Sequence, residues 1–403
     1  MKRLFYTLLF CLPCVLIACG GSDDTLGGDD NPPVVVPPDE ETVDSRLLYN
    51  GIRLPEQWPP VRSSSSELEK GMSPFYLSNK PSVINISVGR QLFVDNFLIE
   101  STNLKRTFYY PEYYSGNPIL TPEQDWEKTG TKGAAFAAPF SDGVWYDEKE
   151  GKYKMWYMAG GGSYATNGAG ITCYAESTDG IRWTKPTLSI VAGTNIVDYN
   201  SERDASVIWM DKQESNASKR YKMFLVARES GKWRYHYKTS PDGKVWRAAA
   251  QSEPIADRST VYKNPFRNVW VYSMRHNVRV NANKLVRARD YNENADPEAG
   301  TKKAEALLSA FWFGPWANEQ RHTDYPNIAP AIYNQDATPY ESIMLGFFSV
   351  WQGPENDVCA SDNVIKRNQV MVGYSRDGYS WFREDMNCLL YTSPSPRDRT
   401  RSR

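Results

Sequence analysis

Short hydrophobic runs rich in aromatic and β-branched residues alternate with polar turns through most of the chain. Runs of this length, bounded by Gly, Asp and Asn, are typical of β-strands. Two successive units repeat the same order of three runs, each followed by a turn. The runs are 143–147, 152–159 and 171–176 in the first unit, and 206–211, 220–227 and 233–239 in the second. The pattern predicts antiparallel hairpins and an all-β fold.

The motif S-x-D-G-x-x-W ends each unit and occurs three times, starting at Ser177, Ser240 and Ser375. Its Asp-Gly step supplies the positive φ of a tight hairpin, so we place it between the third and fourth strands. Its aspartates, at 179, 242 and 377, are separated by 63 and then 135 residues. Since the second gap is about twice the first, a degenerate copy is expected near residue 309. We expect the three aspartates to hold turns.

A third unit begins at 259–262, and a fourth begins near 328–333 and continues through 342–350. Four strands per unit, repeated about every 65 residues, describe a propeller blade. Arg90 to Ile99 is interpreted as an N-terminal strand of the last blade. The sequence therefore predicts a five-bladed β-propeller over 88–387, truncated in its last blade. A β-sandwich with similar hairpins is the alternative.

The N-terminus has the features of an export signal. Lys2 and Arg3 precede an apolar run that is too short to span a membrane and ends at Cys19. Residues 1–19 thus resemble a lipoprotein signal peptide, with Cys19 as the lipidated residue. The acidic stretch at 20–24 resembles the export tag of surface lipoproteins in the Bacteroides group. We expect a lipid-anchored protein of the outer membrane or cell surface; an ordinary secretory signal is the alternative.

The two segments that flank the predicted domain differ from it in composition. Residues 20–80 begin with Gly-Gly pairs, acidic residues and a Pro-rich stretch, and we expect a disordered tether. From Cys388 the chain reads CLLYTSPSPRDRTRSR, which lacks the strand pattern. Residues 388–403 resemble a translated sequencing-adapter artefact, with a natural basic tail as the alternative. On the first interpretation the natural protein continues beyond residue 387.

Charge and composition exclude several function classes. A net charge of −1 leaves no basic footprint for nucleic acid. Within the predicted domain only Cys173 and Cys359 remain, enough for one disulfide but not for a metal motif. The three histidines are scattered, so we expect no zinc site and no cofactor. The many aromatic residues suit sheet cores, and secondarily flat platforms for sugars.

Acidic residues recur near the starts of the predicted innermost strands, which converge on one axial pocket in a propeller. Several carboxylates around a pocket suit glycoside hydrolysis, which needs one protonated acid and one ionised carboxylate. The alternative for each residue is an Asp that caps a turn. The candidates are Asp95, Asp142, Asp204, Asp257, Asp324 and Glu341.

Four segments, 90–95, 143–147, 152–157 and 257–260, resemble a group of secreted five-bladed propeller glycosyl hydrolases akin to glycoside hydrolase families 32, 43 and 117. The resemblance covers about residues 88–387. Arg203-Asp204-Ala205 only approximates the Arg-Asp-Pro motif of the fructosidases. The roles that the resemblance implies are base or nucleophile for Asp95 or Asp204, orienting carboxylate for Asp257 and general acid for Glu341.

Basic residues beside these acids are candidates for substrate binding. Arg258, Arg275 and His276 suit an acidic or hydroxyl-rich sugar, and Asp324 joins them as a substrate-binding candidate. The leading hypothesis is a glycoside hydrolase that acts on extracellular polysaccharide or oligosaccharide. The alternative is a non-catalytic glycan-binding surface lipoprotein with the same fold.

Overall fold

The computed structural model describes residues 44–109, 111–128, 135–281, 284–305, 309–384 and 390–392. The predicted signal peptide, its lipidated Cys19 and the first part of the predicted tether lie outside the described residues, as does most of the predicted tail. Within the described part of the chain, no helix is long and apolar enough to cross a membrane.

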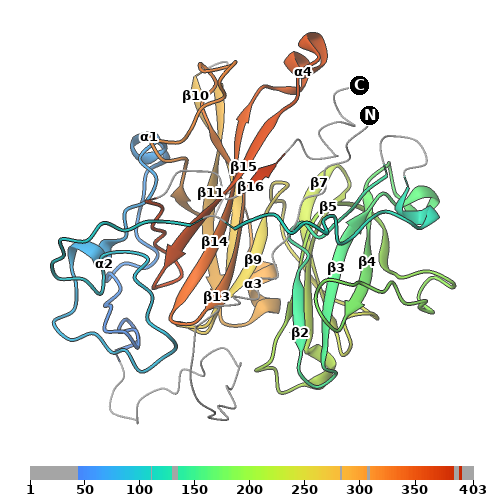
Figure 1. The fold of residues 1–403 in the computed structure, drawn as a ribbon, viewed down its shortest axis with the longest axis horizontal. Helices are drawn as coiled ribbons and strands as arrows, with labels where there is room; N and C mark the ends of the chain where they lie inside the picture. The colour runs from blue at the N-terminus through green and yellow to red at the C-terminus, as the bar shows by residue number, and fades with distance from the viewer. Residues whose placement is uncertain are drawn as a thin grey trace.

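The fold is all-β, and its described strands form three antiparallel sheets, one of eight strands and two of four (Figure 1). One long strand joins two blades within the larger sheet, so the sheets make up four blades. In the first blade β1 (Ala137–Ala138) and β2 (Val144–Asp147) both pair with β3 (Lys152–Ala159), followed by β4 (Gly170–Ser177) and the start of β5 (Ile196–Met210). The second consists of the rest of β5, β6 (Tyr221–Glu229), β7 (Lys232–Ser240) and β8 (Arg247–Gln251). The third consists of β9 (Thr260–Asn264), β10 (Val269–Asn281), β11 (Lys284–Asn294) and β12 (Ala310–Phe313), and the fourth of β13 (Ala331–Tyr340), β14 (Ile343–Gly353), β15 (Arg367–Ser375) and β16 (Leu390–Thr392).

Helices are few and short, and they lie in the connections. They are α1 (Ser64–Glu67), α2 (Phe75–Ser78), α3 (Pro297–Lys303) and α4 (Asn356–Asp362), with 3-10 turns η1 (Asp125–Glu127), η2 (Gly162–Tyr164) and η3 (Ala217–Lys219). The propeller blades expected from the repeat are thus present. The degenerate fourth copy corresponds to β12, the outermost strand of the third blade. Four blades account for the described strands, so a count of five is not confirmed.

The predicted N-terminal strand over Arg90 to Ile99 is absent from the structure, where this segment is irregular coil. The side chain of Asp95 accepts a 3.0 Å hydrogen bond from the backbone N–H of Phe97. Such a local bond gives the backbone an alternative to a strand ladder. The prediction failed because the apolar run 92–94 was given more weight than the Asp that follows it.

Residues 44–80 are packed against the blades, which differs from the expected tether over 20–80. A tight turn joins Leu47 to Arg53 through an isolated β-bridge. The side chains of Leu48, Ile52 and Tyr76 form a small core together with Phe97. The Pro-rich stretch ends at residue 38, and the apolar residues after it allow burial. At the other end, residues 390–392 pair with β15, although they belong to the predicted tail.

The S-x-D-G-x-x-W motifs form the expected turns. In the first copy the hydroxyl of Ser177 accepts a 2.9 Å hydrogen bond from the N–H of Gly180, and Asp179 Oδ1 accepts from the N–H groups of Ile181 and Arg182 at 2.8 and 2.7 Å. The same contacts recur in the copies that start at Ser240 and Ser375. The prediction that these aspartates are structural is confirmed.

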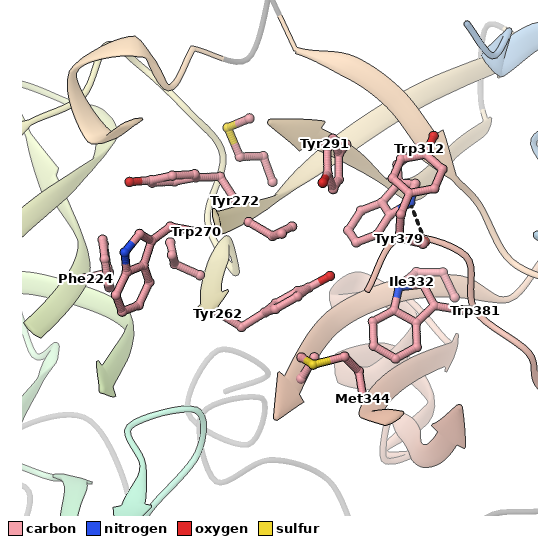
Figure 2. Close-up of a cluster of buried hydrophobic side chains, with 14 of the residues drawn as sticks. Phe224, Tyr262, Trp270, Tyr272, Tyr291, Trp312, Ile332, Met344, Tyr379 and Trp381 are labelled. Atoms are coloured by element: carbon pink, nitrogen blue, oxygen red, sulfur yellow. Dashed lines mark hydrogen bonds between the residues drawn. The ribbon is translucent and has the colours of Figure 1, made fainter. Parts of the chain in front are cut away.

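Aromatic side chains pack the blades against one another (Figure 2). Trp312 Nε1 of the third blade donates a 3.0 Å hydrogen bond to the carbonyl of Tyr379 in the turn of the fourth. Trp156 of the first blade donates in the same way to Gly243 in the turn of the second, at 2.6 Å. Most of the aromatic content therefore serves the core. Cys173 and Cys359 are both buried and form no disulfide, so the one that two cysteines allow is not made.

Candidate functional site

Polar residues of the four innermost strands meet through direct contacts. The N–H of Arg258, just before β9, donates a 2.7 Å hydrogen bond to Asp204 in β5. The Thr260 hydroxyl in β9 donates to the carbonyl of Gln335 in β13. Eight polar residues at and around these contacts are called the axial cluster: Ser141, Asp142, Arg203, Asp204, Asp257, Arg258, Asn334 and Asp336.

Asp336 lies in the middle of β13 and keeps part of its surface exposed. Its Oδ2 accepts hydrogen bonds from Ser141 Oγ of the first blade at 2.9 Å and from Asn334 Nδ2 at 2.7 Å. Burial raises the pKa of the Asp336 carboxyl to about 6, against the lowering effects of Ser141 and the nearby arginines. A carboxyl group with this pKa is partly protonated near neutral pH, as a general acid requires.

Asp142 and Arg203 form a fully buried ion pair between the first two blades. Arg203 Nη2 lies 2.6 Å from Asp142 Oδ1 and 2.7 Å from Oδ2, and Arg203 Nη1 donates to Thr172 Oγ1 at 2.5 Å. Burial raises the pKa of Asp142, while the guanidinium of Arg203 lowers it. Asp142 is 0% exposed, so it supports the cluster without facing solvent.

Asp204 holds Arg258 in an unusual backbone conformation. Arg258 has φ +56, and its N–H and guanidinium Nε both face Asp204 Oδ2, the latter at 3.6 Å. The Arg258 guanidinium carbon lies 5.6 Å from the ring centroid of Phe140 and 5.5 Å from that of Tyr333. A cation between two rings in this way is fixed in position.

Asp257 directly precedes Arg258, and it is more accessible to solvent than Asp204. Its Oδ1 lies 2.5 Å from Nη2 of Arg275 in β10, and its side chain is 16% exposed. Asp204 is only 2% exposed. The axial cluster thus presents one carboxyl group with a raised pKa, Asp336, and one arginine-paired carboxylate, Asp257.

Two of the four predicted catalytic acids do not lie in the axial cluster. Asp95 is fully buried against Arg376, with contacts of 2.8 to 3.0 Å, in the outer turn of the fourth blade. Glu341 lies in the turn between β13 and β14, where Arg90 binds it through Nε at 2.8 Å and Nη2 at 2.6 Å. Five strand positions separate it from Asp336, roughly 17 Å. Each acid fastens the N-terminal segment to the fourth blade.

The predicted substrate-binding residues separate in the same way. Arg258 and Arg275 belong to or contact the axial cluster. His276 lies on the opposite face of β10, where its Nδ1 is 2.7 Å from Asp290 Oδ2, and this contact raises the pKa of His276. Asp324 is exposed in the loop before β13, and its N–H donates to His322.

Asp336 was missed from the sequence. It lies between the two runs predicted for the fourth unit, 328–333 and 342–350, and was assigned to neither. In the structure Pro339 pairs with Met344 within β13, the edge strand of its sheet. Proline is tolerated on an edge strand because its missing N–H faces no partner. An Asp in the middle of an innermost strand was the signal available.

Metal ligands do not gather in the described residues, where no group of three or more His, Cys, Asp or Glu side chains is placed to hold an ion.

Comparisons with known proteins place this chain among distant structural relatives. No family model matches the sequence, and no curated protein matches it. The solved structures that resemble it include glycoside hydrolases. One is a glycoside hydrolase from Bacteroides ovatus described as putative (TM-score 0.40, 13% identity, 72% of this chain and 84% of that one). Another is an α-L-arabinanase from Cellvibrio cellulosa complexed with arabinohexaose (TM-score 0.39, 7% identity, 67% and 84%). A third is a fructofuranosidase from Schwanniomyces occidentalis complexed with fructosylnystose (TM-score 0.40, 12% identity, 67% and 51%), of whose length this chain spans about half.

Proposed function

We propose that the axial cluster hydrolyses glycosidic bonds of extracellular polysaccharides or oligosaccharides. The observation that carries this proposal is the presence of two carboxyl groups in different surroundings within the axial cluster, one in β13 and one just before β9. Asp336 is partly protonated near neutral pH, and Asp257 is paired with the guanidinium of Arg275. Two carboxyl groups set apart in this way are what acid-assisted cleavage of an acetal requires.

In this mechanism Asp336 donates its proton to the glycosidic oxygen as the bond to the anomeric carbon breaks. The carboxylate of Asp257 stabilises the positive charge that develops on the sugar ring and acts on the anomeric carbon, directly or through a water molecule. Arg258, fixed by Asp204 and two rings, orients the site. Ser141 and Asn334 hold the Asp336 carboxyl in position through Oδ2 and leave Oδ1 for the substrate.

The test is the release of reducing sugar from a panel of oligosaccharides by the wild type and by Asp336→Asn. Loss of a general acid lowers the rate by about 10² to 10⁴ fold. Asp125→Asn is the matched control, because Asp125 is an exposed aspartate in η1 whose ion pair within the described residues is with Lys128 on the surface. No turnover of any glycan by the wild type, or equal turnover by both variants, would refute the proposal.

A second function is favoured by the inaccessibility of two axial acids. Asp142 and Asp204 are sealed by Arg203 and Arg258, and neither exposes more than 2% of its surface. A cluster sealed in this way suits a non-catalytic protein that binds glycans. That function predicts saccharide binding by the wild type without hydrolysis, and the same affinity in Asp336→Asn.

We further propose attachment to the outer membrane or cell surface through Cys19, on the basis of the N-terminal sequence. Expression of Cys19→Ala should shift the protein from the membrane fraction to the soluble exported fraction. Retention of the variant in the membrane fraction would contradict lipidation at this residue.

A further inference from the structure

We propose that the axial site takes an anionic saccharide, whose carboxylate or sulfate group is bound by a face of arginines on β10 and β11. This arginine face consists of Arg275, Arg287 and Arg289. The inference relies on the proposed function only for the place where the saccharide binds, and it holds equally for a site that binds without cleaving.

The arginine face is part of a two-stranded ribbon that extends beyond the third blade. β9 pairs with β10 only over Val269 to Ser273, and β12 pairs with β11 only over Arg289 to Tyr291. The pairing of β10 with β11 continues well past these residues (Figure 1). At its base the ribbon contacts the axial cluster through Arg275 and Arg289.

The three arginines lie on one side of this ribbon. Arg275 pairs directly with Arg289 across the strands, and Arg287 is two residues from Arg289 on the same strand, so the three share a face. That face is turned toward the axial cluster. Arg275 reaches Asp257 at 2.5 Å, and Arg289 Nη1 donates to the carbonyl of Arg258 at 2.9 Å.

The arginine face places three guanidinium groups beside two ion-paired carboxylates, Asp257 and Glu355, and the charges of Asp336 and Asp290 also act on Arg289. Arg289 is fully buried, and its hydrogen bonds within the described chain go to neutral acceptors, Ser273 and the Arg258 carbonyl. Arg287 lies 3.8 Å from Glu355, which is 54% exposed, and its guanidinium carbon lies 4.8 Å from the ring centroid of Trp351. Like charges placed directly across a ladder, as Arg275 and Arg289 are, destabilise a sheet. An anionic ligand would relieve this repulsion.

Arg275 and Arg287 retain unused donors. The Nε of each is buried and has no hydrogen-bond partner among the described residues, while the side chains as a whole are 15% and 21% exposed. A guanidinium binds carboxylate and sulfate oxygens through paired N–H donors.

Tyr333 indicates that the anion is attached to a sugar. Its ring centroid lies 5.5 Å from the Arg258 guanidinium and 5.8 Å from that of Arg287, and its side chain is partly exposed. The exposed part of this ring offers apolar surface beside an anion site, which suits a sugar ring that carries an acidic group. Asp336 follows three residues later on the same strand.

The experiment measures binding to Asp336→Asn by calorimetry, so that cleavage does not interfere. One arm compares a galacturonic acid oligomer with its methyl ester, which is neutral and otherwise identical. The other compares a sulfated oligosaccharide with its desulfated form. We expect at least one acidic ligand to bind about ten times or more tightly than its neutral partner, with an affinity that falls as salt is added. The arm that shows the difference identifies the anionic group.

Arg275→Gln and Arg287→Gln should each reduce this preference toward one, and Arg287→Lys should restore part of it through charge alone. Arg247→Gln, on the exposed edge strand β8, is the matched control and should leave the preference unchanged. The melting temperature of each variant verifies folding. Equal binding of acidic and neutral ligands, no binding of any acidic ligand, or an equal loss in Arg247→Gln would overturn the inference. Preferential binding without hydrolysis by the wild type would instead refute only the proposed hydrolase.

Discussion

Ser141 and Asp336 are 195 residues apart in the chain, yet the hydroxyl of Ser141 donates a 2.9 Å hydrogen bond to the Asp336 carboxylate. The contact joins the first blade to the innermost strand of the fourth. It places a carboxyl group with a pKa of about 6 at the point where the blades converge. The chemistry proposed for this protein depends on that carboxyl being protonated at working pH.

The activity should therefore decline on the alkaline side. Because Asp336 acts as the acid, hydrolysis needs its protonated form, which falls about tenfold per pH unit above 6. We expect kcat/KM to lose about a factor of ten between pH 6.5 and 7.5, and the residual activity of Asp336→Asn to lack this limb. A wild-type profile that is flat up to pH 8 would assign the acid to another group.

The same pKa also predicts how stability depends on pH. The folded-state pKa of Asp336 lies above the unfolded value of 3.8, so the folded state binds more protons between pH 4 and 6. Stability from this group is therefore complete below about pH 4 and is lost as the pH rises through 6. Asn does not ionise, so Asp336→Asn should unfold at a higher urea concentration than the wild type at pH 8. Its free energy of unfolding should be larger by about 1–3 kcal/mol. The difference between variant and wild type should vanish near pH 4. If the variant instead loses stability relative to the wild type on going from pH 4 to pH 8, the assignment is contradicted.

Much of the framework could be predicted because it depends on local rules. The Asp-Gly turns at 179, 242 and 377 need only their own residues, and they define where the third and fourth strands of a blade meet. Spacing between the turns then predicts the repeat. Asp204 and Asp257 were found because each lies just before or within an innermost strand.

The rest depended on contacts between distant segments. Asp95 and Glu341 have the same appearance in sequence as Asp204, but Arg376 and Arg90 neutralise them. Those partners are 281 and 251 residues away. Sequence spacing alone does not reveal such pairs. The choice of acid was decided by tertiary structure: the fold made Asp336 part of a strand and Glu341 part of a turn.

Those two arginine pairs should differ in their effect on stability. Arg376 and Asp95 are 2% and 0% exposed, so Asp95→Ala leaves a buried charge unpaired and should cost about 3–5 kcal/mol. Arg90 is 66% exposed, so Glu341→Gln should cost less than about 1 kcal/mol and leave hydrolysis unchanged. Urea unfolding and the reducing-sugar assay measure both. Loss of activity in Glu341→Gln with an intact fold would return the role of acid to Glu341.

The buried ion pair inside the axial cluster should also contribute more to stability than a surface ion pair does. Asp142→Ala removes the carboxylate that contacts Arg203 at 2.6 and 2.7 Å, and it should destabilise the protein by about 3–5 kcal/mol. Glu298→Ala breaks an exposed pair with Lys302 and should cost less than about 1 kcal/mol. Similar urea midpoints for the two variants would show that Asp142 and Arg203 do not depend on one another.

The turn glycines give a stricter test of blade packing, because two of them share a conformation but not an environment. Gly180 and Gly378 have φ +72 and +74 at the same position of the motif. A Cβ at Gly180 would come no closer than 3.8 Å to the Tyr153 ring, whereas at Gly378 it would lie 2.2 Å from Asn264 Nδ2. Both alanine variants suffer the left-handed backbone strain, about 1–2 kcal/mol.

Only Gly378→Ala also forces Asn264 away from the carbonyl of Asp377, to which it donates a buried 2.8 Å hydrogen bond. Gly378→Ala should therefore be less stable than Gly180→Ala by about 1–3 kcal/mol, which is the cost of leaving a buried polar group without a partner. Urea unfolding of the two variants side by side measures the difference. Equal destabilisation would mean that the turn of the fourth blade does not pack on the third as closely as the structure places it. The stability of the propeller would then come from each blade separately, rather than from the contacts between one blade's turn and the next blade's strands.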